Sequence, residues 1–325
     1  MQTANRTSLQ AHESRTCRVL SLDGGGAKGF YTLGILQEIE ALAQQPLHSC
    51  FELIFGTSTG AIIAALLARG DSVASARALY ERHVPTIMRA NPVRPRTDAL
   101  HALARAVFGD QQSEVFKTHV GIVTTNWSDE RPMIFKTSSR QAHGSKSTFV
   151  PFFGCKVADA IIASCSAYPF FDRHKLKTSI GNVELADGGF CANNPALYAV
   201  TDAHLALGYE HRNIRLVSLG VGSYPQPTLL RRAGRILQNW PLLRHVPASD
   251  FIQKILSTNT KSMETLYAVI FQHVPTIRIS DTYVEPELAT DLLEHDLSKL
   301  ERLAQKGRRS FGAHESELRQ LLLQD

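Results

Sequence analysis

The stretch CRVLSLDGGGAKGFYTLGILQEIEALAQ, residues 17–44, decides the fold. Its first six residues form a short apolar run that ends at a glycine cluster, which is typical of a buried strand. After the glycines, Leu33, Leu36, Ile39 and Ala43 recur at helical spacing. The stretch therefore predicts a strand, a glycine turn and a helix.

The glycine turn permits two incompatible functions. Gly24, Gly26 and Gly29 satisfy G-x-G-x-x-G, the pattern of a dinucleotide-binding turn. The same glycines could instead direct backbone N–H groups at an oxygen that becomes negative during acyl transfer. A dinucleotide site needs an acidic residue about 20 positions further on, at the end of the second strand, but Glu52 opens that strand. A P-loop is also disfavoured, because Gly29 follows Lys28 where Ser or Thr is required.

Strands and helices alternate along the next 180 or so residues, which predicts an α/β fold with a mainly parallel sheet covered by helices on both faces. We expect a helix from residue 157 that ends before Pro169, and a loop at NPVRPRT, residues 91–97, because of its two prolines. The other expected elements are strands at 51–56, 119–127, 131–139, 183–187 and 213–222, and helices at 61–70 and 72–88.

The remainder of the chain suggests three regions. Residues 1–15 are polar, lack the apolar core of a secretory signal and are expected to be loosely ordered. Residues 16–223 form the expected sheet-containing core, and YPQPT, residues 224–228, marks a boundary. Residues 224–325 are expected to be a helical C-terminal portion packed on the core. Within it, TLLRRAGRILQNWPLL, residues 228–243, could be a basic amphipathic helix on a membrane or, by the more ordinary interpretation, a helix facing the core.

Bulk composition is that of an ordinary globular protein. The 325 residues are 43% hydrophobic and 20% charged, and no apolar run approaches the roughly 18 residues of a membrane span. The five cysteines include no C-x-x-C pair, which favours reduced thiols in the cytoplasm over a disulfide framework or zinc site. A net charge of +5 favours anionic partners.

GTSTG, residues 56–60, is a candidate nucleophile site. It follows a predicted strand and opens a predicted helix, the context that a G-x-S-x-G nucleophile elbow requires. Gly56 and Gly60 supply the small residues that a sharp turn needs, and Ser58 would be held at its tip. The alternative is that Ser58 only caps the following helix, since Ser is a preferred N-cap.

A serine needs a general base, and two kinds are available. An α/β-hydrolase would use a histidine late in the chain, and the candidates are His204, His211, His245, His273 and His295. None of them follows a predicted strand at a turn. Asp187 in VELADGGFCANNP does, and Gly188 and Gly189 allow the backbone to turn sharply past it. Asp187 could take the serine proton directly or could only form an Asx-turn.

Taken together, LDGGGAKG, GTSTG and DGGFCANNP make residues 17–223 resemble the patatin-like phospholipase family. The resemblance implies a three-layer α/β/α hydrolase fold. It implies that Ser58 is the nucleophile, Asp187 the base of a Ser–Asp dyad, and Gly24, Gly25 and Gly26 the oxyanion-hole loop. The residues that support these motifs are Asp23, Gly29, Gly56, Gly60, Gly188 and Gly189.

The resemblance also implies a substrate and a setting. The reaction would be cleavage of fatty-acyl esters of membrane phospholipids through an acyl-enzyme, with no cofactor or metal. The enzyme would be cytoplasmic and would associate peripherally with the membrane when active; DNA and RNA are not expected partners, and a homo-oligomer stays open. Some bacterial members of about this size are antiphage effectors that a cyclic nucleotide activates, and the basic stretches at 89–105 and 228–261 could hold such an anion. A His-containing triad acting on small esters is the alternative.

Overall fold

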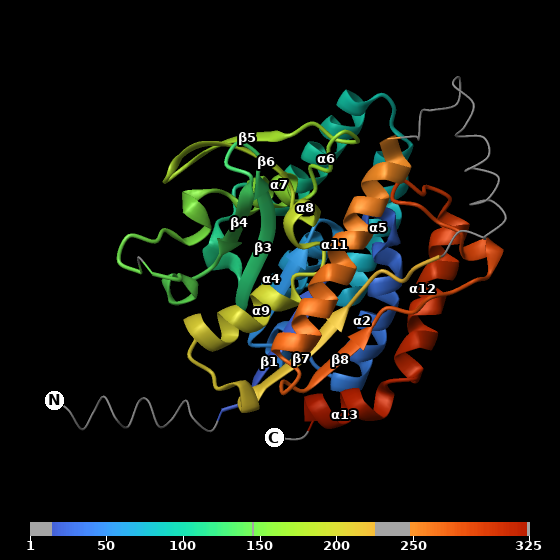
Figure 1. The fold of residues 1–325 in the computed structure, drawn as a ribbon. Coiled ribbons are helices and arrows are strands. Elements are labelled where there is room, and N and C mark those ends of the chain that lie inside the picture. Colours follow the sequence, from blue (N-terminus) through green and yellow to red (C-terminus); the bar gives the residue numbers. More distant parts are fainter. Residues whose placement is uncertain (1–14, 145, 225–247, 324–325) are drawn as a thin grey trace, which may run out of the picture.

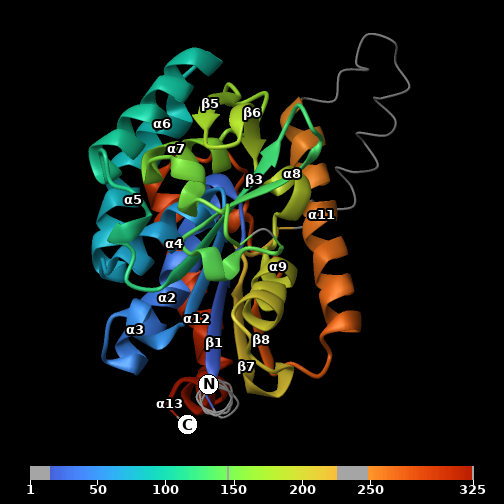
Figure 2. The ribbon, with the colours of Figure 1, turned by 90° about the vertical axis from the view of Figure 1, so that its left-hand side faces the viewer.

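The computed structural model describes residues 15–144, 146–224 and 248–323. A mixed sheet of eight strands lies between two layers of helices (Figures 1 and 2). The predicted amphipathic helix at 228–243 and nearly all of the predicted N-terminal region lie outside the described residues, as does much of the second basic stretch. No helix of the described ranges is long and apolar enough to cross a membrane.

The sheet has the strand order β5-β6-β3-β2-β1-β7-β8, with β4 paired to the free edge of β3. Five neighbouring strands, from β3 through β2, β1 and β7 to β8, run parallel, whereas β4, β5 and β6 pair antiparallel. The strand bounds are β1 Cys17–Leu22, β2 Leu53–Thr57, β3 His119–Asn126, β4 Arg131–Lys136, β5 His174–Thr178, β6 Gly181–Asp187, β7 Ile214–Leu219 and β8 Thr276–Ile279.

Each central strand is apolar on both faces because both are covered by helices. In β1, Leu20 and Leu22 belong to one core cluster, while Cys17 and Val19 belong to the other. The first cluster packs against α2 Gly29–Ala43, α4 Thr59–Arg69, α5 Val73–Arg89, α6 Val93–Phe108, α7 Val157–Ser164, α12 Leu297–Gly312 and α13 Glu315–Leu323. The second packs against α9 Ala196–Thr201 and α11 Ala248–Ile270 (Figure 2).

Shorter helices connect these layers. They are the 3₁₀ turn η1 Gly26–Lys28 directly before α2, α3 Leu47–Cys50, and α8 Gly189–Ala192 after β6. The remaining short helical turns are η2 Ser113–Val115, η3 Ser139–Gln141, η4 Pro151–Gly154, η5 Asp202–Ala206, η6 His211–Asn213 and η8 Pro286–Leu288.

The expected loop at 91–97 is wrong for its last five residues, 93–97, which are helical. Helix α6 begins at Val93, so Pro95 is its third residue. The first turn of a helix has no intrahelical acceptor for its N–H groups, and a proline there loses no hydrogen bond. Helix α7 ends at Ser164, earlier than its sequence pattern indicates, because the N–H groups of Asp187 and Gly188 bond the carbonyls of Ser166 and Ser164.

The C-terminal portion contributes to the sheet as well as to the helical layer. Strand β8, which the sequence analysis missed, extends the parallel sheet beyond β7. Helix α12 packs on α2 at very close range, since a Cβ on Gly34 would lie 2.1 Å from the carbonyl oxygen of Ala304. A Cβ on Gly307 would lie 2.1 Å from that of Tyr31. The predicted division at 224–228 stays a prediction.

Candidate active site

Ser58 lies in a strained turn between β2 and α4. Its φ and ψ of 54° and −121° are a conformation that side-chain-bearing residues rarely adopt, and such strain marks functional turns. A Cβ on Gly56 would lie 2.3 Å from the carbonyl oxygen of Gly60, and one on Gly60 would lie 2.3 Å from that of Leu22. Ser58 occupies the N-cap position of α4, but its side chain forms no capping hydrogen bond. The interpretation of Ser58 as only a helix cap is therefore wrong.

The backbone of this turn is fixed from a neighbouring helix. The Ser58 N–H donates to Ser164 Oγ at 2.9 Å, and that hydroxyl donates to the Val123 carbonyl at 2.6 Å. Ser164 is fully buried at the end of α7. Ser164 was not identified as a site residue from the sequence.

Strand β3 brings Ser58 and Asp187 together. Strand β2 pairs with the first half of β3 and ends where Thr57 pairs with Val123. Strand β6 runs the opposite way along the same edge and ends where Asp187 pairs with Thr124. The carboxyl ends of β2 and β6 therefore meet at consecutive residues of β3, which brings the Ser58 side chain close enough to the Asp187 carboxyl to lower its pKa.

Asp187 is held in a buried and oriented position. Its side chain is 2% exposed, and its Oδ1 accepts the Gly189 N–H at 2.7 Å. Burial raises the pKa of Asp187 to about 6, and the hydrogen bonds from Ser58 and Gly189 oppose that rise. Asp187 therefore makes both contacts that the sequence offered as alternatives: the Asx-type hydrogen bond from the Gly189 N–H and the contact with Ser58. Its carboxylate is ionised at neutral pH and is a stronger proton acceptor than an ordinary Asp.

The loop Gly24–Gly26 lies against Ser58. A Cβ on Gly24 would approach Ser58 Cβ to 3.3 Å, and Gly26 has a φ of 58°. The Gly24 N–H donates to the Asn193 carbonyl at 2.9 Å, whereas the N–H groups of Gly25 and Gly26 have no acceptor among the described residues. Gly25 and Gly26 line the same cavity as Ser58, so their N–H groups are available to a ligand there. Thr59, which also lines it, was not identified from the sequence.

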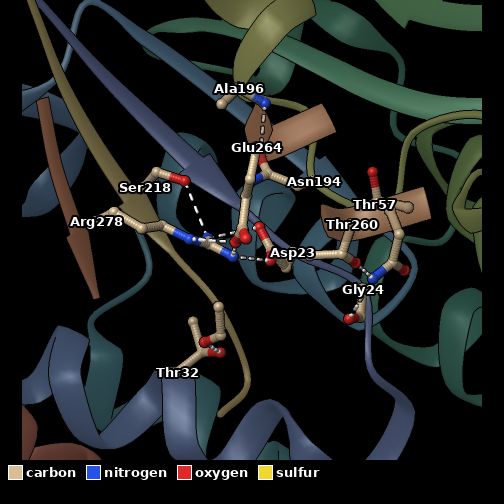
Figure 3. Close-up of polar contacts among 12 residues, drawn as sticks. Asp23, Gly24, Thr32, Thr57, Asn194, Ala196, Ser218, Thr260, Glu264 and Arg278 are labelled. Atoms are coloured by element: carbon tan, nitrogen blue, oxygen red, sulfur yellow. Dashed lines mark hydrogen bonds and ion pairs between the residues drawn. The ribbon is translucent and has the colours of Figure 1, made fainter. Parts of the chain in front are cut away.

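Asp23 anchors this loop from beneath. Its carboxylate forms two hydrogen bonds with the Arg278 guanidinium, at 3.0 and 2.6 Å (Figure 3). Arg278 in β8 also bonds Ser218 at 3.0 Å and Glu264 of α11. Burial raises the pKa of Asp23 to about 6 while Arg278 opposes that rise, so the carboxylate is ionised at neutral pH. Asp23 therefore supports the loop, and it does not line the cavity that contains Ser58.

Arg278 was missed because β8 was missed. TIRI offers only two apolar residues in alternation, too short a pattern to separate from the surrounding helices.

Asn193 braces the other side of the loop. Its side-chain amide donates to the Gly24 carbonyl at 3.2 Å and to Thr260 of α11 at 2.7 Å. Its own N–H donates to Asn259 Oδ1 at 2.8 Å. Two consecutive residues of α11 thereby hold the segment that follows the D-G-G motif, a role that the quoted CANNP sequence did not reveal.

The cavity beside Ser58 is apolar. Side chains of α4, α5 and α6, of the loop after α7, and of α11 line it together with Ser58, Asp187 and Asn193. The apolar lining residues are Ile62, Val84, Ile87, Met88, Leu100, Leu103, Ala167, Phe170, Phe171, Leu256, Leu292 and Leu293. The apolar lining matches the chemistry of an acyl chain next to a polar reacting centre, and the cavity between these side chains measures about 60 Å³.

The remaining motif glycines allow close backbone approaches. A Cβ on Gly29 would lie 2.5 Å from Thr59 Oγ1, and one on Gly188 would lie 2.2 Å from the Val123 carbonyl oxygen. A Cβ on Gly189 would lie 2.7 Å from Leu256. Gly29 and Gly188 therefore let η1, α4 and β3 converge around Ser58 and Asp187.

Of the described residues, no histidine lines the cavity. His204, His211 and His273 instead gather with one another, with ring centroids 3.8 and 4.6 Å apart. His295 is exposed, and His245 lies outside the described residues. The geometry supplies a carboxylate to Ser58, not an imidazole.

Comparison with known proteins gives one family. The family described as patatin-like phospholipase matches residues 20–200. The chain is 54% identical over 310 residues to the cUMP-AMP-activated phospholipase of Escherichia coli, covering 94% of each chain. It is 29% identical to the cGAMP-activated phospholipase of Escherichia coli (strain TW11681), covering 66% of this chain and 64% of that one. The cGAMP-activated phospholipase of Vibrio cholerae is also 29% identical, over 57% of each chain.

Proposed function

This chain belongs to the patatin-like phospholipase family, and from that premise we propose that it hydrolyses fatty-acyl esters of membrane phospholipids with Ser58 and Asp187. The observation that carries the proposal is that the ends of β2 and β6 place Ser58, in its strained turn, beside the buried Asp187 carboxylate. Both residues line a cavity whose other side chains are mostly apolar, which matches the chemistry of an acyl chain.

The first half of the reaction forms an acyl-enzyme. Ser58 Oγ attacks the ester carbonyl carbon while its proton passes to the Asp187 carboxylate. The carbonyl oxygen becomes negative, and the N–H groups of Gly25 and Gly26, with that of Thr59 at the start of α4, are positioned to donate to it. Loss of one such donor costs on the order of 3 kcal/mol in the activation barrier. Because the Gly24 N–H is bonded to Asn193, Gly24 contributes by placing the loop.

The second half returns the enzyme to its starting state. Protonated Asp187 gives its proton to the departing alcohol of the lyso-product. Asp187 then takes a proton from a water molecule that attacks the acyl carbonyl, and the collapse of this second intermediate frees the fatty acid and restores the Ser58 hydroxyl. Only the residues of this chain are required for these steps.

We propose that a cyclic dinucleotide activates the enzyme in antiphage defence. The active enzyme would work in the cytoplasm, at the surface of the membrane. The name of the 54% identical relative, cUMP-AMP-activated phospholipase, supports this proposal. The two relatives named as cGAMP-activated support a cyclic dinucleotide as the class of activator.

The test is hydrolysis of mixed phospholipid vesicles, with the released fatty acids and lysolipids identified by mass. Wild-type protein should hydrolyse them many-fold faster with one member of a panel of cyclic di- and trinucleotides. Ser58→Ala and Asp187→Asn should abolish hydrolysis, and no single His→Ala variant should do so. A folded histidine variant as inactive as Ser58→Ala would overturn the dyad. Equal wild-type rates with and without every nucleotide would overturn the regulation alone.

A further inference from the structure

A second, polar cavity of about 200 Å³ adjoins the active-site cavity. We call it the rear cavity and define it by Lys28, Ser257, Lys261, Ser280 and Gln253, which line it. Gly25, Asn193, Leu256 and Leu292 line both cavities. The rear cavity is smaller than the roughly 300 Å³ or more of cavities that enclose a whole small ligand. It therefore fits one group of a larger ligand.

The charges around the rear cavity leave two cations without a counter-charge in contact. Lys28 and Lys261 form no hydrogen bond or ion pair with their side chains to any of the residues that the structure describes. The two carboxylates of the lining, Asp23 and Glu264, are both bound to Arg278. The two carboxylates share one guanidinium and keep a net charge of −1, so with Lys28 and Lys261 the charged side chains in and around the lining sum to +1, which favours an anion.

The Lys28 side chain is available to pair with such an anion. It is half-buried at the end of η1, and burial lowers its pKa to about 8, with Asp291 opposing that change. A buried ammonium group without a partner is costly, and a bound anion would offset that cost.

Three neutral side chains of the rear cavity are also free. Ser257, Ser280 and Gln253 have side chains without a hydrogen-bond partner in the described parts of the chain. Gln253, Ser257, Lys261 and Glu264 recur at three- and four-residue intervals, so they share one face of α11. Ser257 and Lys261 are exposed and Gln253 and Glu264 are partly buried, so this polar face of α11 forms the solvent-accessible wall of the rear cavity.

We propose that the rear cavity binds a phosphate diester, with Lys28 and Lys261 pairing with its charge and the free hydroxyl and amide groups completing its hydrogen bonds. This inference rests on the proposed function, which supplies two sources of that group: the cyclic dinucleotide activator and the phospholipid itself.

The cavity is placed to act on the catalytic loop. The Lys28 N–H donates to the Gly25 carbonyl at 3.2 Å, so Lys28 and the two free N–H groups belong to one short turn. An anion that draws the Lys28 side chain into the rear cavity favours the loop conformation in which that side chain is seated. A ligand that binds one loop conformation better than another shifts the loop toward it.

The first arm of the test measures nucleotide binding without lipid. Titration calorimetry of cUMP-AMP uses the full chain carrying Ser58→Ala, combined with Lys28→Met, Lys28→Arg, Lys261→Met or the control Lys175→Met. Lys175 is exposed on β5, at the opposite edge of the sheet from β8. Lys28→Met should weaken binding about ten- to a hundredfold. Lys261→Met should weaken it less, Lys28→Arg should retain most of it, and Lys175→Met should match the parent.

The second arm separates the two sources. With Ser58 intact, kcat/KM is measured for a short-chain phospholipid and for a neutral ester with the same acyl chain. If the lipid phosphate occupies the rear cavity, Lys28→Met and Lys261→Met lower the phospholipid-to-neutral-ester ratio about tenfold or more.

Unchanged nucleotide affinity and an unchanged ratio in both lysine variants would overturn the rear-cavity proposal. If the parent does not bind cUMP-AMP at all, the proposed activation by that nucleotide fails, and the second arm alone decides the rear cavity. The more exposed Lys261 keeps the test valid if Lys28→Met does not fold.

Discussion

At the scale of single residues, the site depends on a carboxylate that is kept basic by burial. Asp187 is 2% exposed and has its pKa raised to about 6. The same burial that makes it a better proton acceptor makes its ionised form costly to the folded state. Catalysis and stability therefore place opposite demands on this one side chain.

The pH dependence of the reaction follows from Asp187. The general base is active when deprotonated, so kcat/KM on a neutral ester should fall as the pH is lowered through about 6. The measurement is a pH profile from about pH 5 to about pH 8, with an ester that does not titrate in that range. The inflection should persist in every single His→Ala variant. Its loss in one of them would contradict the assignment of the base to Asp187.

The stability of Asp187→Asn should change with pH in a defined sense. The folded-state pKa of Asp187, about 6, lies above the ordinary value of 3.8. Its contribution to stability is therefore fully present below the ordinary pKa and is lost as the pH rises through about 6. The asparagine variant should be more stable than wild type by about 2 to 3 kcal/mol above pH 7, as an upper bound, and equal to it below pH 4.

Denaturant unfolding at the two pH values tests this difference. The control is Asp71→Asn, an Asp that is partly exposed and paired with Arg69. This control should not gain stability as the pH rises. An Asp187→Asn variant that is less stable than wild type above pH 7 would contradict burial as the dominant influence on this carboxyl.

At the scale of elements, the candidate site forms where the carboxyl ends of β2 and β6 meet on β3. Glycine-terminated strands and the three motifs could be recognised in the sequence because each is local. The antiparallel return of β6 onto the edge of β3 could not, because nothing local specifies the partner of a strand. That return is nevertheless what brings Asp187 to Ser58.

Other parts of the site have weaker local signals. Arg278 lies 255 residues from Asp23 in the sequence, on a strand of four residues. Pro95 led to the prediction of a loop, although a proline in the first turn is compatible with a helix. Asn193 stood in a quoted motif and Ser164 lies in the predicted helix from residue 157, but their hydrogen bonds depend on tertiary contacts.

The Arg278–Asp23 pair should position the oxyanion loop. Arg278→Met leaves a buried carboxylate without its partner, which should lower stability on the order of 3 kcal/mol and should lower kcat more than it changes KM. Asp23→Asn in the same chain should recover part of the stability, because the unpaired charge is removed. Steady-state kinetics and unfolding of the two single variants and the double variant measure this coupling. Additive effects would contradict direct coupling of the two residues.

Close packing of α12 on α2 gives a second prediction at this scale. Gly307→Ala would bring a methyl group against the Tyr31 carbonyl oxygen, so it should lower the free energy of unfolding by about 1 to 3 kcal/mol. Gly312→Ala, in the same helix, has no atom within 4 Å of the new Cβ and should be neutral or slightly stabilising. Denaturant titration compares the two. Equal effects would show that the helices do not meet as closely as described.

At the scale of the whole molecule, one sheet places two cavities on either side of a glycine loop. The apolar cavity contains Ser58 and Asp187, and the rear cavity contains Lys28 and Lys261. Asp23 directly after β1, Asn193 directly after α8, and Arg278 of β8 hold the loop between the cavities, with contacts from α11. The C-terminal third of the chain is therefore part of the catalytic architecture and not only a cover for the core.

The most direct test of the central claim is to find where the acyl group or its mimic becomes attached. Wild-type protein is treated with a lipid-like fluorophosphonate, and the labelled peptide is identified by mass. The label should lie on the peptide containing Ser58, should be absent in Ser58→Ala, and should form far more slowly in Asp187→Asn. Labelling at another residue, or equal labelling rates in wild type and Asp187→Asn, would contradict the Ser58–Asp187 dyad.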